Sequence, residues 1–118
     1  MTWSSNVLNE SEIRECVYSD NSEVKKKFKE SFSSEVDNFI ETVHKAYKLW
    51  DSLDKNIAHY GKREAYIVAF LFCALRNMVN SLNLLMSGYV SASGNLVRQY
   101  GESVAMAILM SNKSLPFF

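Results

Sequence analysis

The 118-residue sequence predicts an all-α fold: a helical bundle of four main helices in which two long helices run antiparallel. Three observations lead to this prediction. Only one proline and four glycines interrupt the chain. A long stretch repeats apolar residues every three or four positions, and no segment alternates as strands do. Because a chain of this length supports one core, residues 1–118 are expected to form a single helical-bundle domain.

The first helix is expected to be short and to follow a loose lead-in over residues 1–9. Ser11 is placed to cap a helix that ends near Tyr18. Glu12 and Glu15 would then lie in the first turn, where the helix dipole favours acidic side chains. A cluster of cap and turn residues separates this helix from the next.

The longest helical pattern covers about residues 23–60. Its apolar residues alternate spacings of three and four over more than three heptads, which is typical of a helix that packs along its length; they are Val36, Phe39, Val43, Ala46, Trp50, Leu53, Ile57 and Tyr60. The pattern predicts one helix over 23–60, or two with a break near Ser33-Ser34. Gly61 is expected to end it.

Two further helices are predicted over about residues 62–87 and 91–111. The first is apolar all round in its N-terminal part, as expected of a central helix. Gly88 ends it, and Ser91 is expected to cap the second. The short connection predicts that the two helices pack antiparallel.

Charge divides the chain into two unequal halves. The last 54 positions contain only four charged residues, whereas the first 64 contain 22. Because charged side chains keep a surface hydrated, we expect the charge-poor half to be buried, inside the monomer or against another copy. This predicts a homodimer or larger homo-oligomer that associates through the last two helices.

Small and aromatic residues mark the candidate oligomer interface. Gly94, Gly101 and Ala105 lie on one side of the last predicted helix, where each glycine destabilises the helix by about 1 kcal/mol relative to alanine. Close approach of a neighbouring helix explains that composition. Pro116 ends the pattern, and the aromatic Phe117 and Phe118 are expected to dock on the bundle or on a protein partner.

Polar residues in the charge-poor half form a candidate ligand-binding seam. They occupy one side of each of the two last helices and would meet across an antiparallel hairpin. One interpretation is structural, with the Arg98–Glu102 pair buried and satisfied. The other is a site where a guanidinium binds phosphate or carboxylate. The residues of this polar seam are Arg76, Asn80, Asn83, Arg98, Gln99 and Glu102.

Several functional classes lack their sequence signatures. There is no glycine-rich phosphate loop, paired-cysteine zinc pattern, His-Glu-x-x-His or nucleophile elbow. We therefore predict no cofactor, no metal and no catalytic residue. Zero net charge argues against nucleic acid as a partner. No signal peptide is recognisable, and the apolar run of residues 65–75 is too short to span a membrane. A cytoplasmic protein with reduced cysteines is expected.

The stretch Leu75–Leu109 resembles helical domains allied to the HEPN superfamily, chiefly through Leu96-Val97-Arg98-Gln99-Tyr100-Gly101-Glu102. The resemblance implies a four- or five-helix bundle that dimerises, and many such domains belong to toxin–antitoxin and phage-defence systems. Active members cleave RNA with an arginine, a polar residue directly after it, and a histidine a few residues later. Arg98-Gln99 matches that start, but the histidine positions hold Ser103, Val104 and Ala105. The resemblance therefore implies a non-cleaving member.

Three functional hypotheses follow. The first is a non-catalytic, self-associating interaction module, an accessory of a toxin–antitoxin or phage-defence or counter-defence system. The second is a metal-independent, HEPN-like ribonuclease that uses Arg98 with His44 or His59 brought in by folding or dimerisation. The third is a small-ligand-binding bundle in which Arg76 and Arg98 anchor an anion in the polar seam.

Overall fold

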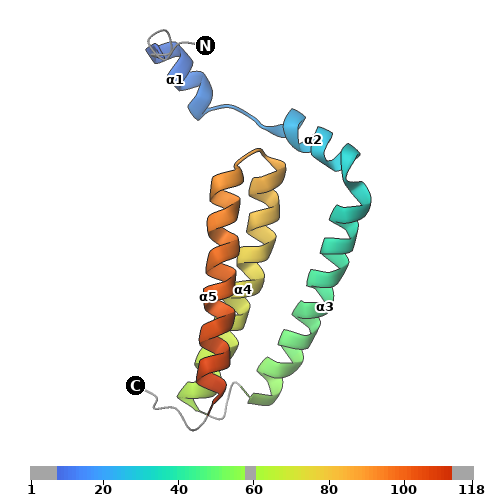
Figure 1. The fold of residues 1–118 in the computed structure, drawn as a ribbon, viewed down its shortest axis with the longest axis vertical. Coiled ribbons are helices and arrows are strands. Elements are labelled where there is room, and N and C mark those ends of the chain that lie inside the picture. The colour runs from blue at the N-terminus through green and yellow to red at the C-terminus, as the bar shows by residue number, and fades with distance from the viewer. Residues whose placement is uncertain (1–7, 58–60, 113–118) are drawn as a thin grey trace.

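The computed structural model of the chain describes residues 8–57 and 61–112. Every regular element in these two segments is a helix, so the all-α prediction is confirmed (Figure 1). Helices α3 and α4 are the longest, and they run in opposite directions. In chain order the helices are α1 (Glu10–Val17), α2 (Ser22–Ser31), α3 (Ser33–Ile57), α4 (Lys62–Met86) and α5 (Val90–Ser111).

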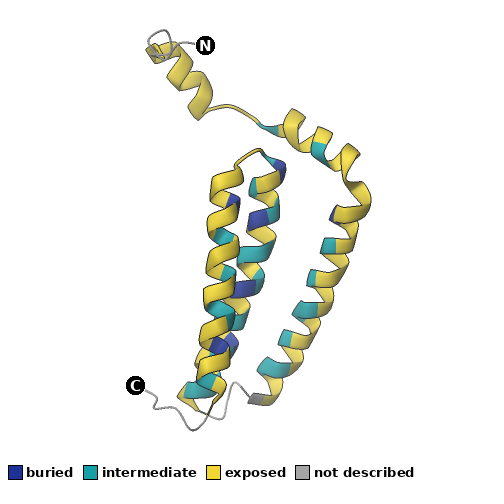
Figure 2. Cartoon of the chain, viewed as in Figure 1, coloured by how far each residue is buried: buried dark blue, intermediate teal, exposed yellow. Residues whose placement is uncertain are grey.

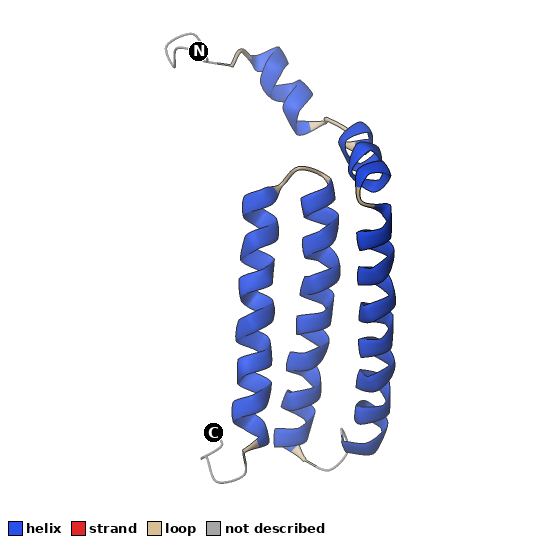
Figure 3. Ribbon diagram, turned by 45° about the vertical axis from the view of Figure 1, so that its right-hand side comes forward, coloured by secondary structure: helices blue, strands red, loops and turns tan. Residues whose placement is uncertain are grey.

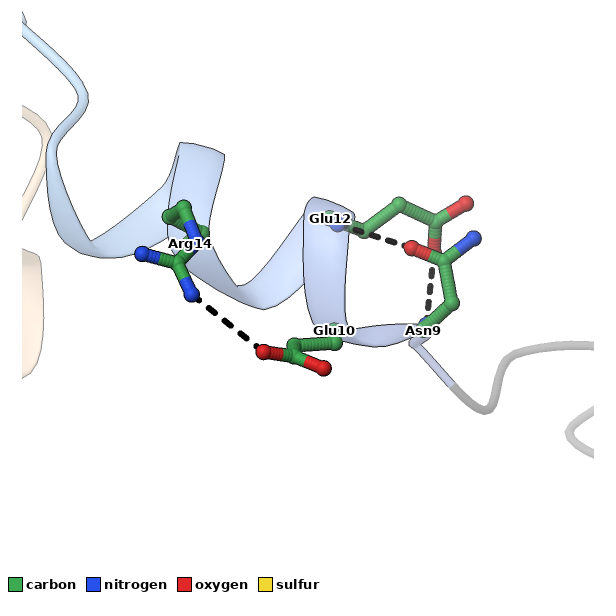
Figure 4. A network of polar contacts seen from close by, with 4 residues as sticks. All are labelled: Asn9, Glu10, Glu12 and Arg14. Atoms are coloured by element: carbon green, nitrogen blue, oxygen red, sulfur yellow. Dashed lines mark hydrogen bonds and ion pairs between the residues drawn. The ribbon is translucent and has the colours of Figure 1, made fainter.

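Helix α1 is stabilised by interactions within its own first turns (Figure 4). The backbone N–H of Glu12 donates to Oδ1 of Asn9 at 2.8 Å, and the backbone N–H of Asn9 donates to the Glu12 carboxylate at 3.3 Å. This capping box makes Asn9 the N-cap, so the expectation of Ser11 was wrong. The reason is spacing: a glutamate lies three residues after Asn9, whereas an arginine lies three residues after Ser11.

The long apolar pattern is divided between two helices, as one of the two alternatives predicted. Phe32 separates α2 from α3, with φ −127° and ψ 31°, and its N–H donates to the Phe28 carbonyl. The rings of Phe28 and Phe32 contact each other with centroids 4.9 Å apart. Helix α3 ends at Ile57, and Gly61 is the N-cap of α4 rather than the end of the preceding helix.

Helices α3, α4 and α5 lie in a layer with α4 in the middle (Figures 1 and 3). Within the described residues the backbone of α3 approaches α4 but not α5. Trp50 links α3 to α4, because its indole Nε1–H donates to the Val68 carbonyl at 2.9 Å and its ring lies 5.0 Å from that of Phe72. The molecule measures 59 × 34 × 21 Å along its principal axes. The described helices therefore form an open layer and not a closed four-helix bundle.

The α4–α5 hairpin packs through small side chains. Ala74 and Ser81 of α4 and Ser93 and Ala107 of α5 are buried. The Ser93 hydroxyl donates to the Ser81 carbonyl at 2.8 Å, in a buried hydrogen bond. Small residues let the two helix backbones approach closely. Several large apolar side chains of the two helices, among them Phe72, Val97 and Ile108, stay exposed.

The turn between α4 and α5 explains why α5 begins before Ser91. Gly88 has φ +90°, the left-handed conformation that favours glycine. The Tyr89 N–H donates to the Leu84 carbonyl and the Gly88 N–H to the Leu85 carbonyl, which together form a Schellman motif. The chain leaves this motif directly into α5 at Val90, and its N-cap, Tyr89, makes no side-chain capping bond. The expectation that Ser91 caps this helix was therefore wrong.

The charge-poor half is not buried inside the protomer, which corrects one of the two predicted alternatives. Figure 2 shows exposed residues along both α4 and α5. The chain has 9073 Å² of accessible surface, compared with about 6,500 Å² for a compact chain of this mass. Its radius of gyration is 19.5 Å, compared with about 13.5 Å for a compact domain of this length. Burial against another copy stays a prediction.

Candidate functional site

The Arg98–Glu102 pair lies on the surface of α5. Arg98 Nε and Glu102 Oε1 are 3.9 Å apart, and the side chains are 70% and 67% exposed. The predicted buried pair was therefore wrong for the protomer. The reason is helical geometry: Arg98 and Glu102 each lie two residues from the half-buried Tyr100, so both project from the opposite side of α5. An exposed pair of this spacing contributes only a few tenths of a kcal/mol.

The α4 members of the polar seam lie on a different surface. Arg76, Asn80 and Asn83 are exposed, on the side of α4 that faces away from α5. Asn83 Oδ1 accepts a hydrogen bond from Lys25 Nζ of α2 at 2.5 Å. The fold therefore does not bring Arg76, Asn80 and Asn83 together with Arg98, Gln99 and Glu102. The prediction that the three residues of each helix share one helix face was correct. The prediction that the two faces meet was wrong.

Gln99 and Glu102 instead line a polar hollow between α4 and α5. Its volume is about 430 Å³, and Asn77 lies on the α4 side. Among the described side chains that line it, the charged one is the carboxylate of Glu102. A carboxylate disfavours an anion, so this hollow does not fit the predicted phosphate or carboxylate ligand. Asn77 was missed because it shares no face with the other polar residues of α4. The full lining is Phe70, Cys73, Asn77, Gln99, Glu102, Ser103 and Met106.

A second feature is an apolar groove across the three-helix layer, with a volume of about 380 Å³. Helix α4 forms its floor, and α3 and α5 form its walls. The Trp50 N–H is already bonded to the Val68 carbonyl, which leaves the Tyr100 hydroxyl as the polar group of the lining. The groove is therefore suited to apolar side chains. Its residues are Ala46, Leu49, Trp50, Leu53, Leu71, Ala74, Leu75, Tyr100 and Val104.

The groove lies over α4, between α3 and α5. Leu49, on the α3 wall, is 73% exposed in the protomer. Ala46, Trp50 and Leu53 belong to the heptad pattern that the sequence revealed. The pattern was therefore read correctly as a packing surface. What it could not indicate is that α5 packs beside α4 and leaves this surface open.

An apolar stripe on α5 continues the groove. Its residues recur every three or four positions and adjoin Val104 at the groove wall. Val90 is 66% and Ile108 is 64% exposed. Apart from the adjacent residues and the backbone of α5 itself, no atom lies within 4 Å of the position that a Cβ would take at Gly94 or Gly101. We call this set the α5 stripe: Val90, Gly94, Val97, Gly101, Ala105 and Ile108. It contains three of the predicted interface residues, while Phe117 and Phe118 lie outside the described residues.

The residues of the predicted ribonuclease are not brought together. His44 lines a hollow between α3 and α4, together with Tyr47 and Val79, and no α5 residue takes part in it. Arg98 lies on the outer side of α5. His59 lies outside the described residues. Within the part of the chain that the structure describes, no three histidine, cysteine or acidic side chains are placed to hold a metal ion.

Comparison with known proteins found no matching family, no matching curated protein and no matching solved structure. The resemblance to HEPN-like domains therefore stays a prediction. Of the described helices, α4 is long and apolar enough to cross a membrane by length and composition alone. The mean hydropathy of its most apolar 18-residue window is 1.4, and 17% of that window is buried. Core helices of soluble proteins pass the same test but are mostly buried, so the expectation of no membrane span stays a prediction.

Proposed function

We propose that this chain is a non-catalytic helical interaction module that functions by self-association. One observation carries the proposal: the protomer is an open three-helix layer whose apolar groove has no cover within the described residues. Exposed apolar patches of this kind mark interaction sites on soluble proteins. A partner helix that covers the groove would form a four-helix arrangement with α3, α4 and α5.

The exposed area supports an extensive interface rather than a brief encounter. The protomer exposes roughly 2,500 Å² more than a compact chain of its mass, and part of this excess comes from α1 and α2, which contain no buried residue. Obligate homodimers bury about 1,000–2,500 Å² per subunit. The charge-poor composition of α4 and α5 agrees with this, because interface cores are depleted of charged residues.

The biological setting belongs to the same proposal. The HEPN-like sequence around Arg98 supports an accessory role in a toxin–antitoxin or phage-defence or counter-defence system. Because the exposed Arg98 of α5 and the exposed His44, which lines a hollow between α3 and α4, lie on different parts of the protomer, we favour a binding or scaffolding role over RNA cleavage. Incubation of micromolar protein with labelled RNA should leave the RNA intact. Cleavage that disappears in Arg98→Ala would overturn this assignment.

Sedimentation velocity and light scattering across a range of concentrations test the self-association directly. We expect a species with twice the chain mass of 13.5 kDa, which dissociates only at low concentration. A chain that remains monomeric up to the highest soluble concentration would exclude the proposed function.

A further inference from the structure

We propose that the occupant of the apolar groove is α5 of a second copy of this chain, in a reciprocal twofold-symmetric dimer. Each α5 would lie over the other protomer's groove, and the two α5 stripes would pack against each other, antiparallel, at the centre. This inference rests on the proposed self-association and adds the surface and the geometry.

The first argument is that the groove and the α5 stripe lie on the same side of the molecule. Val104 forms part of the groove wall, and Gly101 and Ile108 lie three and four residues away from it on the adjoining side of α5. A twofold dimer uses the same patch on both subunits, so the patch must complement itself. A patch with both a groove and an exposed helix edge meets this requirement, because the helix edge of each subunit enters the groove of the other subunit.

The second argument comes from the glycines. Each lies inside α5, where glycine destabilises a helix by about 1 kcal/mol relative to alanine. In the protomer nothing near Gly94 or Gly101 requires the absence of a side chain, and both have helical conformations. A second helix crossing at this edge supplies the reason, since glycine lets two backbones approach closely.

The third argument is charge complementarity. Arg98 and Glu102 flank the α5 stripe and make a long contact of 3.9 Å within their own helix. In an antiparallel pair of α5 helices with the twofold axis near Gly101, Arg98 lies beside the partner's Glu102. The same axis places Glu102 beside the partner's Arg98. Two ion pairs at the rim then fix the register of an otherwise apolar contact.

Other candidates for the occupant of the apolar groove do not share this complementarity with α5. An unrelated helix or a lipid surface would use the groove without requiring glycines at the α5 edge. We therefore treat both as outcomes that contradict the inference.

Site-directed disulfide formation tests the geometry. The exposed Cys16 and Cys73 are first changed to serine, and Gly101→Cys and Gln99→Cys are compared in that background. Gly101 lies in the stripe, whereas Gln99 faces the polar hollow on the other side of α5. Under mild oxidation Gly101→Cys should give covalent dimers at least about tenfold faster than Gln99→Cys, because only its sulfurs are held close to the axis. Equal rates would overturn the inference.

A charge placed in the stripe tests the energetics. Gly101→Glu puts an unpaired charge at the centre of the interface and should weaken the dimer roughly 100-fold. Asn80→Glu adds the same charge on the outer side of α4 and should leave the dissociation constant unchanged. Circular dichroism should show equal helix content in both variants. Their comparison by sedimentation therefore measures the interface and not the fold.

The outcomes separate this inference from the proposed function. A wild-type dimer that resists Gly101→Glu, and in which Gly101→Cys does not cross-link, overturns the inference and leaves self-association standing. A monomer at every concentration overturns both. Flotation of the wild-type chain with phosphatidylcholine vesicles, without a dimer in buffer, also overturns both. Loss of dimerisation in Arg98→Glu that is restored by the added change Glu102→Arg supports the twofold register.

Discussion

Helices α1 and α3 carry ion pairs spaced four residues apart. Helix α5 has one longer pair of this spacing, Arg98–Glu102, but the contact between α4 and α5 is made by small buried side chains. The pairs of α1 and α3 are Arg14–Glu10 at 3.2 Å, Lys45–Glu41 at 3.3 Å and Lys55–Asp51 at 2.8 Å, all exposed to solvent. In the last pair, the hydrogen bond and charge of Asp51 raise the pKa of Lys55. The hairpin instead has close approach at small buried residues, Ala74, Ser81, Ser93 and Ala107. In addition, the Arg63 guanidinium of α4 donates to the carbonyls of Met110 and Asn112 at the end of α5.

This difference shows that helix formation and helix placement have separate causes in this chain. Charged helices with good caps form from interactions between near neighbours in sequence, and α1 forms without a backbone approach to any other described helix. The hairpin is placed by contacts between residues far apart in the chain. Substitutions should therefore act locally in the first region and cooperatively in the second.

The largest loss of stability is expected at Trp50, which links α3 to α4. Trp50→Ala removes the ring contact with Phe72 and the bond to the Val68 carbonyl, and should lower the free energy of unfolding by about 3 kcal/mol. Trp50→Phe keeps most of the ring and should lower it by about 1 kcal/mol. Chemical denaturation measures both. An effect of Trp50→Ala below that of Trp50→Phe would show that α3 is not packed on α4.

The next largest loss of stability is expected when a larger side chain is introduced between α4 and α5. Ala74→Leu forces a larger side chain between α4 and α5 at a buried position, and should destabilise the chain by about 1–3 kcal/mol. The matched variant Ala69→Leu, on the exposed side of α4, should change the stability by less than about 0.5 kcal/mol. Thermal unfolding compares the two. Equal effects would contradict close packing in the hairpin.

Gly101→Ala should stabilise the isolated protomer. No atom lies near the position of the new Cβ, and alanine is the better helix former by about 1 kcal/mol. The measurement belongs at concentrations below the dissociation constant of any dimer. Destabilisation of the dilute protomer would mean that this edge of α5 is covered by the chain itself.

A local effect of similar size is expected at the capping box of α1. Asn9→Ala removes the bond to the Glu12 N–H and should destabilise α1 by about 1 kcal/mol. Hydrogen exchange should accelerate in residues 10–17 only, because the backbone of α1 does not approach the hairpin, although Tyr89 lines a hollow with Glu12 and Cys16. A matching loss of protection in α4 or α5 would contradict the separation between the two regions.

The smallest effect is expected at the exposed ion pair of α5. Glu102→Ala should change the stability of the dilute protomer by less than about 0.5 kcal/mol, since Arg98 stays in water when its partner is removed. Urea denaturation at low concentration checks this. A loss of several kcal/mol would show that the Arg98–Glu102 pair is buried, as the sequence suggested.

The sequence predicted where the helices lie along the chain, but it did not predict which of their surfaces are buried. The glycines and heptad spacings located the two long helices, and the serines near position 33 located the break between α2 and α3. These signals act within one or two helical turns. Arg98 and Glu102 were misjudged because scarcity of charge in a segment does not say on which side of a helix the few charges lie.

What the sequence by itself determined is the all-helical character of the chain, the division of charge between its halves and the apolar spacing along α3. Only the tertiary structure decided which apolar surface is covered. The physical reason is that α4 is apolar on several sides, so its sequence permits more than one contact with α5. The small residues Ala74, Ser81, Ser93 and Ala107 select one of them, and the larger apolar residues are left to line an open groove.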